Sequence, residues 1–263
     1  MIKIAISPCP NDIFNFYGLL TGRLTLSFPY EIHIKPLHEL NKYASTEDYH
    51  FLKTSFLTYF KHQGSYRLCS LGHSITSTVG PVVFAREQCG IEDLKELVIG
   101  TAGDGTVGDF LVNTLFKGVK TVPMAFSEII PNLQKSKIDA GVVIHEARTE
   151  SDKLKLYKIC DLTELWYQKY HLPTPLGAFL AQRSLSSLIY SEFMRALEKS
   201  KSYAAKNQEK VFTLAKKYSQ EQSREAIAEH ISHFSLDQNY SEKELETLVG
   251  RFQDLVLDRK AKA

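Results

Sequence analysis

Gly80-Pro81-Val82-Val83-Phe84-Ala85 is one of two segments from which the architecture of this chain can be predicted. It is an apolar extended run opened by a Gly-Pro breaker, and Pro173-Thr174-Pro175-Leu176-Gly177-Ala178 is a second run of the same kind. Two such runs are typical of a two-lobed binding fold, in which the chain crosses to a second lobe and later returns. We therefore predict an enclosed lobe at residues 84–176, a discontinuous lobe at residues 1–83 and 177–263, and a cleft between them.

Short apolar runs alternate with helical patterns through the first two thirds of the chain. This alternation predicts the α/β class, and the helical pattern from Leu185 onward predicts a helical C-terminal part. The expected strands are Ile2–Ile6, Glu31–Lys35, Tyr49–Leu52, Tyr66–Leu71, Val79–Ala85, Val98–Thr101, Thr121–Met124, Ala140–Ile144 and Leu176–Ala181. The last helix should begin at the capping-box sequence Ser241-Glu-Lys-Glu244, and its apolar side should consist of Leu245, Leu248, Val249, Phe252 and Leu255.

The composition is that of an ordinary globular protein, with 43% hydrophobic and 24% charged residues. A net charge of +2 is too small for the basic field that nucleic-acid binding needs, so we expect no nucleic-acid partner. The four cysteines show no CxxC spacing, so no metal site is expected. Neither a signal-peptide pattern nor an apolar run of about 18 residues is present, which favours a cytoplasmic protein with no membrane partner.

Ser7-Pro8-Cys9-Pro10-Asn11-Asp12 follows the first strand and precedes a helical stretch. The prolines stop the strand, and Asn11 or Asp12 can cap the helix, so a rigid turn explains the motif. The carboxyl end of a strand next to a helix is also where ligands bind in open α/β sheets. Asn11 and Asp12 are therefore candidate ligand-binding residues, and both interpretations stay open.

Lys53-Thr54-Ser55 lies at a second junction of this kind. Ser55 is a good N-cap by type. Alternatively, the hydroxyls of Thr54 and Ser55, with the free N–H groups of the helix, hold an oxyanion such as a carboxylate, and Lys53 adds positive charge.

A glycine-rich turn, residues 100–108, joins another strand to a helix. It contains neither GxGxxG nor GxxxxGK[ST], which disfavours a dinucleotide. Its glycines allow close approach of a ligand, and Thr106 at the start of the helix could donate its hydroxyl. A plain strand-turn-helix connection explains the same residues.

Asp139-Ala140-Gly141-Val142-Val143-Ile144-His145-Glu146-Ala147-Arg148 is the most informative run for function. A strand buried on both faces ends at a histidine, and a polar group there is costly unless it is paired or meets a cleft. Histidine suits proton abstraction near neutral pH. The residues alone leave two roles open for His145, a catalytic one and a structural one. Glu146 and Arg148 could orient the histidine ring or could lie at the surface.

In this order and at these separations, the four runs resemble the 1,4-dihydroxy-6-naphthoate synthase family of the futalosine route to menaquinone. The Ser-Pro-Cys-Pro-Asn-Asp opening is the most specific element, and the resemblance spans residues 1–180. It implies a type 2 periplasmic-binding-protein fold. It also implies a lyase that converts cyclic dehypoxanthine futalosine, a small carboxylated substrate, to 1,4-dihydroxy-6-naphthoate without a metal or organic cofactor.

The resemblance also implies roles for individual residues. His145 corresponds to the base of the family. The substrate-contacting positions correspond to Lys53, Thr54 and Ser55 and to Thr106 and Val107. The chain departs from the family at Val107, where a second threonine is usual, and at Asp104, where a basic residue is common.

Two alternatives remain at this stage. Chorismate dehydratase of the same pathway has a similar fold but lacks the Ser-Pro-Cys-Pro-Asn-Asp opening. A non-catalytic solute-binding protein for a small anion would share the fold without the chemistry.

Overall fold

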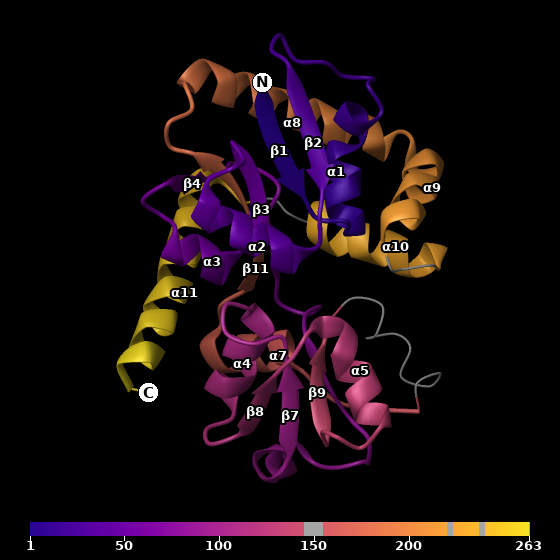
Figure 1. Ribbon diagram of the computed structural model, residues 1–263, viewed down its shortest axis with the longest axis vertical. Helices are drawn as coiled ribbons and strands as arrows, with labels where there is room; N and C mark the ends of the chain where they lie inside the picture. Colours follow the sequence, from indigo (N-terminus) through magenta and orange to yellow (C-terminus); the bar gives the residue numbers. More distant parts are fainter. Residues whose placement is uncertain (145–154, 220–222, 237–239, 263) are drawn as a thin grey trace. The chain divides into compact units, whose positions relative to one another are not determined.

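The computed structural model describes residues 1–144, 155–219, 223–236 and 240–262 (Figure 1). The chain forms two compact units: unit 1 comprises Met1–Ile75 and Pro175–Glu242, and unit 2 comprises Thr76–Thr174 and Lys243–Ala263. Each unit holds one sheet with helices, which confirms the predicted α/β class. The return to unit 1 falls within the expected crossing at residues 173–178, whereas the first passage precedes the run at residues 80–85.

The sheet of unit 1 has the order β2-β1-β3-β11-β4, and β5 also pairs with β11. Strand β1 runs parallel to β2 and β3, whereas β11 is antiparallel to β3 and β4. The strands are β1 (Ile2–Ile6), β2 (Tyr30–Ile34), β3 (Phe51–Ser55), β4 (Tyr66–Leu68), β5 (Ser74–Thr76) and β11 (Thr174–Gln182). Because β3 extends to Ser55, the Lys53-Thr54-Ser55 motif forms the end of the strand instead of following it.

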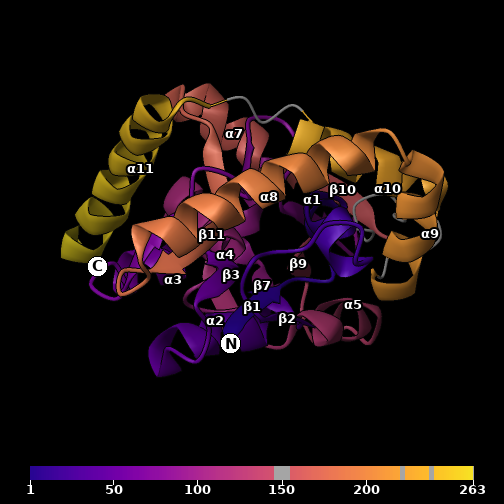
Figure 2. The same ribbon diagram turned by 90° about the horizontal axis from the view of Figure 1, so that it is seen from above.

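Helices α1 and α8 pack against each other beside this sheet, and Figure 2 shows α8 along its full length. The backbone N–H of Gly18 in α1 donates to Ser200 Oγ in α8 over 2.8 Å. A Cβ at Gly18 would lie 3.2 Å from Ser200 Cα, so the lack of a side chain permits this approach. The helices are α1 (Pro10–Leu20), α2 (Leu37–Thr46), α3 (Phe56–Lys61), α8 (Ser187–Ala205), α9 (Gln208–Tyr218), α10 (Arg224–Ile231) and the π-helical segment η3 (Ser232–Leu236).

A cluster of aromatic rings forms the centre of the unit 1 core. Phe51 stacks on Phe193 with ring centroids 3.9 Å apart, and Phe16 meets Phe179 edge to face at 5.3 Å. All four side chains are almost completely buried. These contacts join α1, α8 and the middle of the sheet, and so hold the ends of β1 and β3 in place.

The sheet of unit 2 has the order β10-β6-β9-β7-β8. Strand β7 runs parallel to β8 and β9, and β6 is antiparallel to β9 and β10. The strands are β6 (Val82–Ala85), β7 (Val98–Thr101), β8 (Lys120–Pro123), β9 (Ala140–Val143) and β10 (Tyr157–Asp161). The helices are the 3₁₀ helix η1 (Ile91–Glu96), α4 (Val107–Leu115), α5 (Phe126–Gln134), α7 (Leu162–Tyr170) and α11 (Glu242–Lys262).

The sequence-based assignment missed β5 and β10. Both lack a clear apolar alternation: β5 has three residues, and β10 opens with exposed Tyr157 and Lys158. Short strands of this kind are held by their neighbours in the sheet rather than by their own pattern.

The final helix differs from the sequence-based division, which counted residues 177–263 with the first lobe. The structure places Lys243–Ala263 in unit 2. The ring of Phe252 in α11 is fully buried and lies 5.4 Å from Phe110 and 5.3 Å from Trp166, centroid to centroid. The apolar face of α11 was predicted correctly, but such a face does not specify which core it covers.

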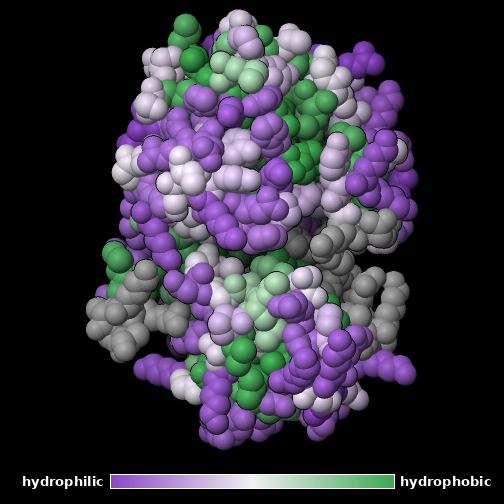
Figure 3. Space-filling model, viewed as in Figure 1, coloured by the Kyte–Doolittle hydropathy of each residue, from purple (hydrophilic) through white to green (hydrophobic). Residues whose placement is uncertain are grey.

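No described helix is both long and apolar enough to cross a membrane. On the face shown in Figure 3, hydrophilic side chains predominate and hydrophobic ones form small areas between them.

The Phe252→Ala variant should lower the free energy of unfolding by about 3–5 kcal/mol, because it removes a buried aromatic ring and leaves a cavity. Urea denaturation measures the change. Leu257→Ala on the same helix is the control: Leu257 is 55% exposed, and its truncation should change stability by less than about 0.5 kcal/mol. Equal changes in the free energy of unfolding for Phe252→Ala and Leu257→Ala would contradict the packing of α11 through Phe252.

Candidate functional site

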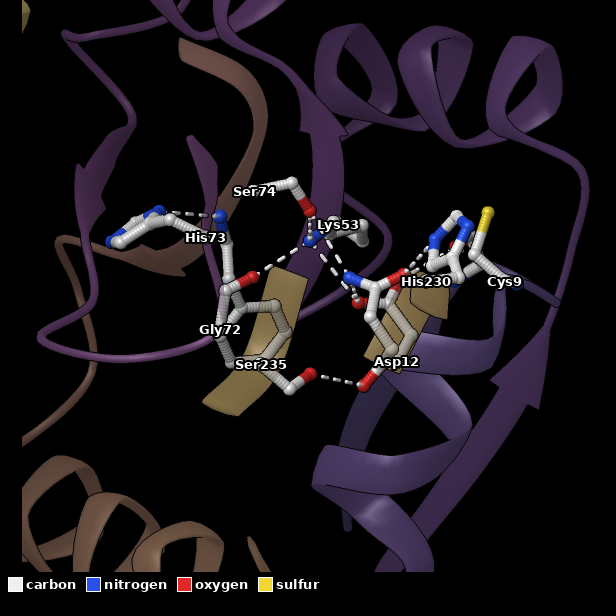
Figure 4. A network of polar contacts seen from close by, with 11 residues as sticks. Cys9, Asp12, Lys53, Gly72, His73, Ser74, His230 and Ser235 are labelled. Atoms are coloured by element: carbon white, nitrogen blue, oxygen red, sulfur yellow. Dashed lines mark hydrogen bonds and ion pairs between the residues drawn. The ribbon is translucent and has the colours of Figure 1, made fainter. Parts of the chain in front are cut away.

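A buried ion pair between Asp12 and Lys53 lies at the centre of a polar network in unit 1 (Figure 4). Lys53 Nζ lies 3.1 Å from Asp12 Oδ1, and the two side chains are 5% and 1% exposed. The ammonium also donates to the carbonyl oxygen of Gly72 at 2.7 Å and to Ser74 Oγ at 3.3 Å. An ammonium has three N–H groups, so these contacts satisfy all of them.

The Ser7–Asp12 turn places the carboxylate of this pair. Strand β1 ends at Ile6 and α1 begins at Pro10, whose fixed φ suits the first turn of a helix. The backbone N–H and the hydroxyl of Ser7 donate to Asp12 Oδ2 at 3.1 and 2.6 Å. The side chain of Asp12 therefore closes the turn on one side and meets Lys53 on the other.

Asn11 connects this turn to two distant segments. Its Nδ2 donates to Ser74 Oγ at 3.0 Å, and its Oδ1 lies 3.0 Å from Nε2 of His230 in α10. Ser235 Oγ in η3 donates to the backbone oxygen of Asn11 at 3.2 Å. Two separate sequence motifs thus predicted Asn11 and Asp12 on the one hand and Lys53 on the other, and the structure brings these residues together.

Ser74, His230 and Ser235 were not identified from the sequence. The sequence around His230 is helical and shows no clear partner, which by itself predicts a structural or solvent-facing histidine. No local signal distinguishes these residues, since their partners lie far away along the chain.

The Lys53-Thr54-Ser55 motif ends strand β3, and its last residue is the N-cap of helix α3. Ser55 Oγ accepts from the N–H of Thr58 at 3.1 Å and donates to Thr58 Oγ1 at 2.9 Å, so it caps α3. Thr54 Oγ1 donates to the carbonyl oxygen of Ser55 at 3.1 Å. The expected N-cap is confirmed, while contact of these hydroxyls with a substrate stays a prediction.

Thr106 and Val107 belong to unit 2, where they begin α4. Thr106 Oγ1 accepts from the N–H of Asp109 at 3.4 Å and donates to the carbonyl oxygen of Gly103 at 2.9 Å. Gly103 and Gly105 have φ of +82° and +95°, a backbone region that favours glycine. Asp104 lies between them, so the turn that precedes Thr106 carries an acidic side chain.

His145, Glu146 and Arg148 lie outside the described residues. Strand β9, which precedes them, is buried along its whole length between β6 and β7. The prediction of a strand buried on both faces before His145 is therefore confirmed.

His73 is a buried histidine next to the ion pair, and its hydrogen bonds define its protonation. Nε2 lies 2.7 Å from the carbonyl oxygen of Cys69, and the N–H of Phe179 donates to Nδ1 at 3.2 Å. Burial lowers the pKa of His73 to about 4, and the positive charge of Lys53 acts in the same direction. His73 is therefore neutral at physiological pH, with its hydrogen on Nε2.

Within the described ranges, no group of three or more His, Cys, Asp or Glu side chains could hold a metal ion. None of the four cysteines, all of which lie in the described ranges, forms a disulfide. Burial raises the pKa of Cys69 well above its ordinary value and that of Cys160 to about 12, so both remain thiols.

The fold is that of the periplasmic-binding-protein class. The periplasmic aliphatic sulphonate binding protein SsuA of Escherichia coli matches with a TM-score of 0.72 at 12% identity, over 99% of this chain and 87% of that one. Protein AF1704 of Archaeoglobus fulgidus matches more closely, with a TM-score of 0.90 at 26% identity, over 99% and 98% of the two chains.

Sequence comparison assigns the family within this class. The sequence model of the menaquinone biosynthesis family matches residues 2–253, and the chain therefore belongs to that family. A relative from Thermus thermophilus, named 1,4-dihydroxy-6-naphthoate synthase, is 30% identical over 240 residues, which are 90% of this chain and 88% of the relative. The family membership inferred from the four motifs is thus confirmed.

Lys53→Met should lower the free energy of unfolding by about 3–5 kcal/mol, because it leaves the carboxylate of Asp12 buried without its counter-charge. The double variant Asp12→Asn/Lys53→Met should be more stable than Lys53→Met alone, since it leaves no unpaired charge. Urea denaturation of the variants measures both effects.

The control for this experiment is Lys35→Met. Lys35 forms an exposed ion pair with Glu39 at 3.8 Å, which should contribute less than about 0.5 kcal/mol. If the double variant is no more stable than Lys53→Met, the unpaired charge of Asp12 is not the cause of the stability lost in Lys53→Met.

The lowered pKa of His73 predicts a pH dependence of stability. In the unfolded chain, His73 takes up a proton as the pH falls below about 6.5, whereas folded His73 stays neutral down to about 4. Protons therefore favour the unfolded state, and stability should fall between pH 6.5 and 4. A His73→Gln variant should lose part of this decline in urea denaturation series, and an unchanged slope would contradict the assignment.

Proposed function

We propose that the chain is a cytoplasmic carbon–carbon lyase that converts cyclic dehypoxanthine futalosine to 1,4-dihydroxy-6-naphthoate in menaquinone biosynthesis. The observation that carries this proposal is the match of the chain, over nine tenths of its length, to a relative named for that product. The Ser-Pro-Cys-Pro-Asn-Asp turn supports it, because the sister chorismate dehydratase family lacks this opening.

The reaction needs a base, donors for a developing oxyanion and exclusion of water. His145 removes a proton next to a carbonyl group of the substrate. A carbon–carbon bond then breaks in a retro-aldol sense, a sugar-derived fragment leaves, and formation of the aromatic naphthoate makes the step favourable. Histidine suits this step because its ordinary pKa lies near neutral pH.

The remaining candidate residues bind the substrate in this proposal. On substrate binding, the hydroxyls of Thr54, Ser55 and Thr106 turn from their acceptors in the protein to the oxygen atoms of the substrate, next to the N-termini of α3 and α4, and Val107 offers its backbone N–H. Asn11 and Asp12, both buried, hold the ends of β1 and β3 next to the substrate, and Lys53 neutralises Asp12. All of these groups act by position and charge, without a metal or organic cofactor.

His145→Asn should lower kcat by about 100- to 10,000-fold while substrate still binds, because it removes the general base. Product formation from cyclic dehypoxanthine futalosine, followed by mass spectrometry, measures the rate. His171→Asn is the matched control: His171 is exposed at the end of α7 with φ of +49°, which asparagine also adopts. A wild-type rate in His145→Asn would remove this mechanism.

The same assay with chorismate distinguishes the sister activity. Dehydration of chorismate without turnover of cyclic dehypoxanthine futalosine would assign the chain to chorismate dehydratase. Binding of a small anion without turnover of either substrate would favour a solute-binding protein.

A further inference from the structure

The hydroxyl of Ser74 has both of its lone pairs in use. Lys53 Nζ donates to Ser74 Oγ at 3.3 Å (Figure 4). Asn11 Nδ2 donates to the same oxygen at 3.0 Å. A serine oxygen accepts two hydrogen bonds and has one hydrogen to donate. With two donors directed at the oxygen, the hydrogen must point away from both.

The direction of the Asn11 contact follows from its other neighbours. The same Nδ2 lies 3.4 Å from Asp12 Oδ1, so an amide oxygen in its place would face a carboxylate oxygen. The amide therefore directs its NH₂ group toward Ser74, and its oxygen accepts from His230 Nε2 at 3.0 Å. Lys53 can only donate, so neither neighbour accepts the hydrogen of Ser74.

In the described part of the chain, the structure records no acceptor for the hydroxyl hydrogen of Ser74. Ser74 is nevertheless buried, with 9% of the residue exposed, and a buried hydroxyl normally donates as well as accepts. Other candidate hydroxyls differ: Thr54 donates to the Ser55 carbonyl and Thr106 to the Gly103 carbonyl.

Gly177 makes room for this arrangement from strand β11. A Cβ at Gly177 would lie 3.3 Å from both Ser74 Oγ and Lys53 Nζ, and 3.0 Å from Lys53 Cε. The lack of a side chain thus keeps the ammonium and the hydroxyl next to each other. Donation from a cation into the serine oxygen also polarises the O–H group and strengthens it as a donor.

We propose that the Ser74 hydroxyl, oriented by Lys53 and Asn11, is a hydrogen-bond donor to the carboxylate of the substrate. This role rests on the proposed function, which places the substrate at the ends of β1 and β3. Lys53 and Asn11 then act as positioning residues, because their side chains orient Ser74. A carboxylate oxygen is the acceptor that a charge-polarised hydroxyl binds most strongly.

The test compares Ser74→Ala, Ser74→Thr and wild type in turnover of cyclic dehypoxanthine futalosine. Ser74→Ala should raise KM by about 10- to 100-fold, the loss of a hydrogen bond to a charged group. It should change kcat by less than about 3-fold, since a carboxylate contact is the same in the ground and transition states. Ser74→Thr retains the hydroxyl and should keep KM within about 5-fold of wild type.

Ser200→Ala is the matched control. Ser200 is a fully buried serine of the same unit whose oxygen accepts from the Gly18 N–H, so its loss affects folding without removing a donor to the substrate. The KM of the Ser200→Ala variant should equal that of wild type. Thermal unfolding shows whether each variant is folded at the assay temperature. If Ser74→Thr is not folded, the KM of Ser74→Ala is compared with that of Ser200→Ala. A KM raised only in Ser74→Ala supports the role of Ser74, and equal KM values contradict it.

A direct binding measurement separates this proposal from the proposed function. Calorimetric titration with 2-naphthoate, an aromatic carboxylate, should show weaker binding to Ser74→Ala than to wild type by a factor similar to the change in KM. Absence of turnover by wild type would contradict the proposed function but not this contact. Equal 2-naphthoate affinities in wild type and Ser74→Ala, or no binding by wild type, would overturn the role of Ser74.

Discussion

The buried ion pair of Asp12 and Lys53 holds together the polar network of unit 1. Two charges almost completely removed from water are costly unless each is paired and hydrogen-bonded. Ser7 and Asn11 complete the environment of the carboxylate, and Gly72 and Ser74 complete that of the ammonium. The Ser7–Asp12 turn, strand β3 and residues 72–74 are therefore fixed relative to one another by one electrostatic requirement.

The topology of the sheet determines which residues meet this ion pair. Strand β11 returns antiparallel to β3 and sets Gly177 opposite Ser55, where its missing side chain leaves space for Lys53 and Ser74. From the other direction, α10 and η3 bring His230 and Ser235 to Asn11. The polar network around Asp12 and Lys53 thus joins segments that are far apart in the sequence and become neighbours only in the folded unit.

The fold itself does not distinguish an enzyme from a binding protein. SsuA of Escherichia coli shares the fold at 12% identity, and its name describes binding of a sulfonate. In an α/β fold, function resides in the side chains at strand ends and helix starts, where the sheet presents its chemistry. For this chain, the family favours an enzyme, whereas the architecture alone does not.

Local features of the chain could be predicted from its sequence. The buried pattern of β9, the N-cap at Ser55 and the apolar face of α11 follow from residues close together in the chain, as does the Ser-Pro-Cys-Pro-Asn-Asp motif that indicated the family. Only the tertiary structure decided which core α11 covers and which partners Asp12, Lys53 and Ser74 have. The physical reason is that periodicity identifies a buried face but not its partner, and a contact such as that of His230 with Asn11, 219 positions apart, forms only when the whole unit has folded.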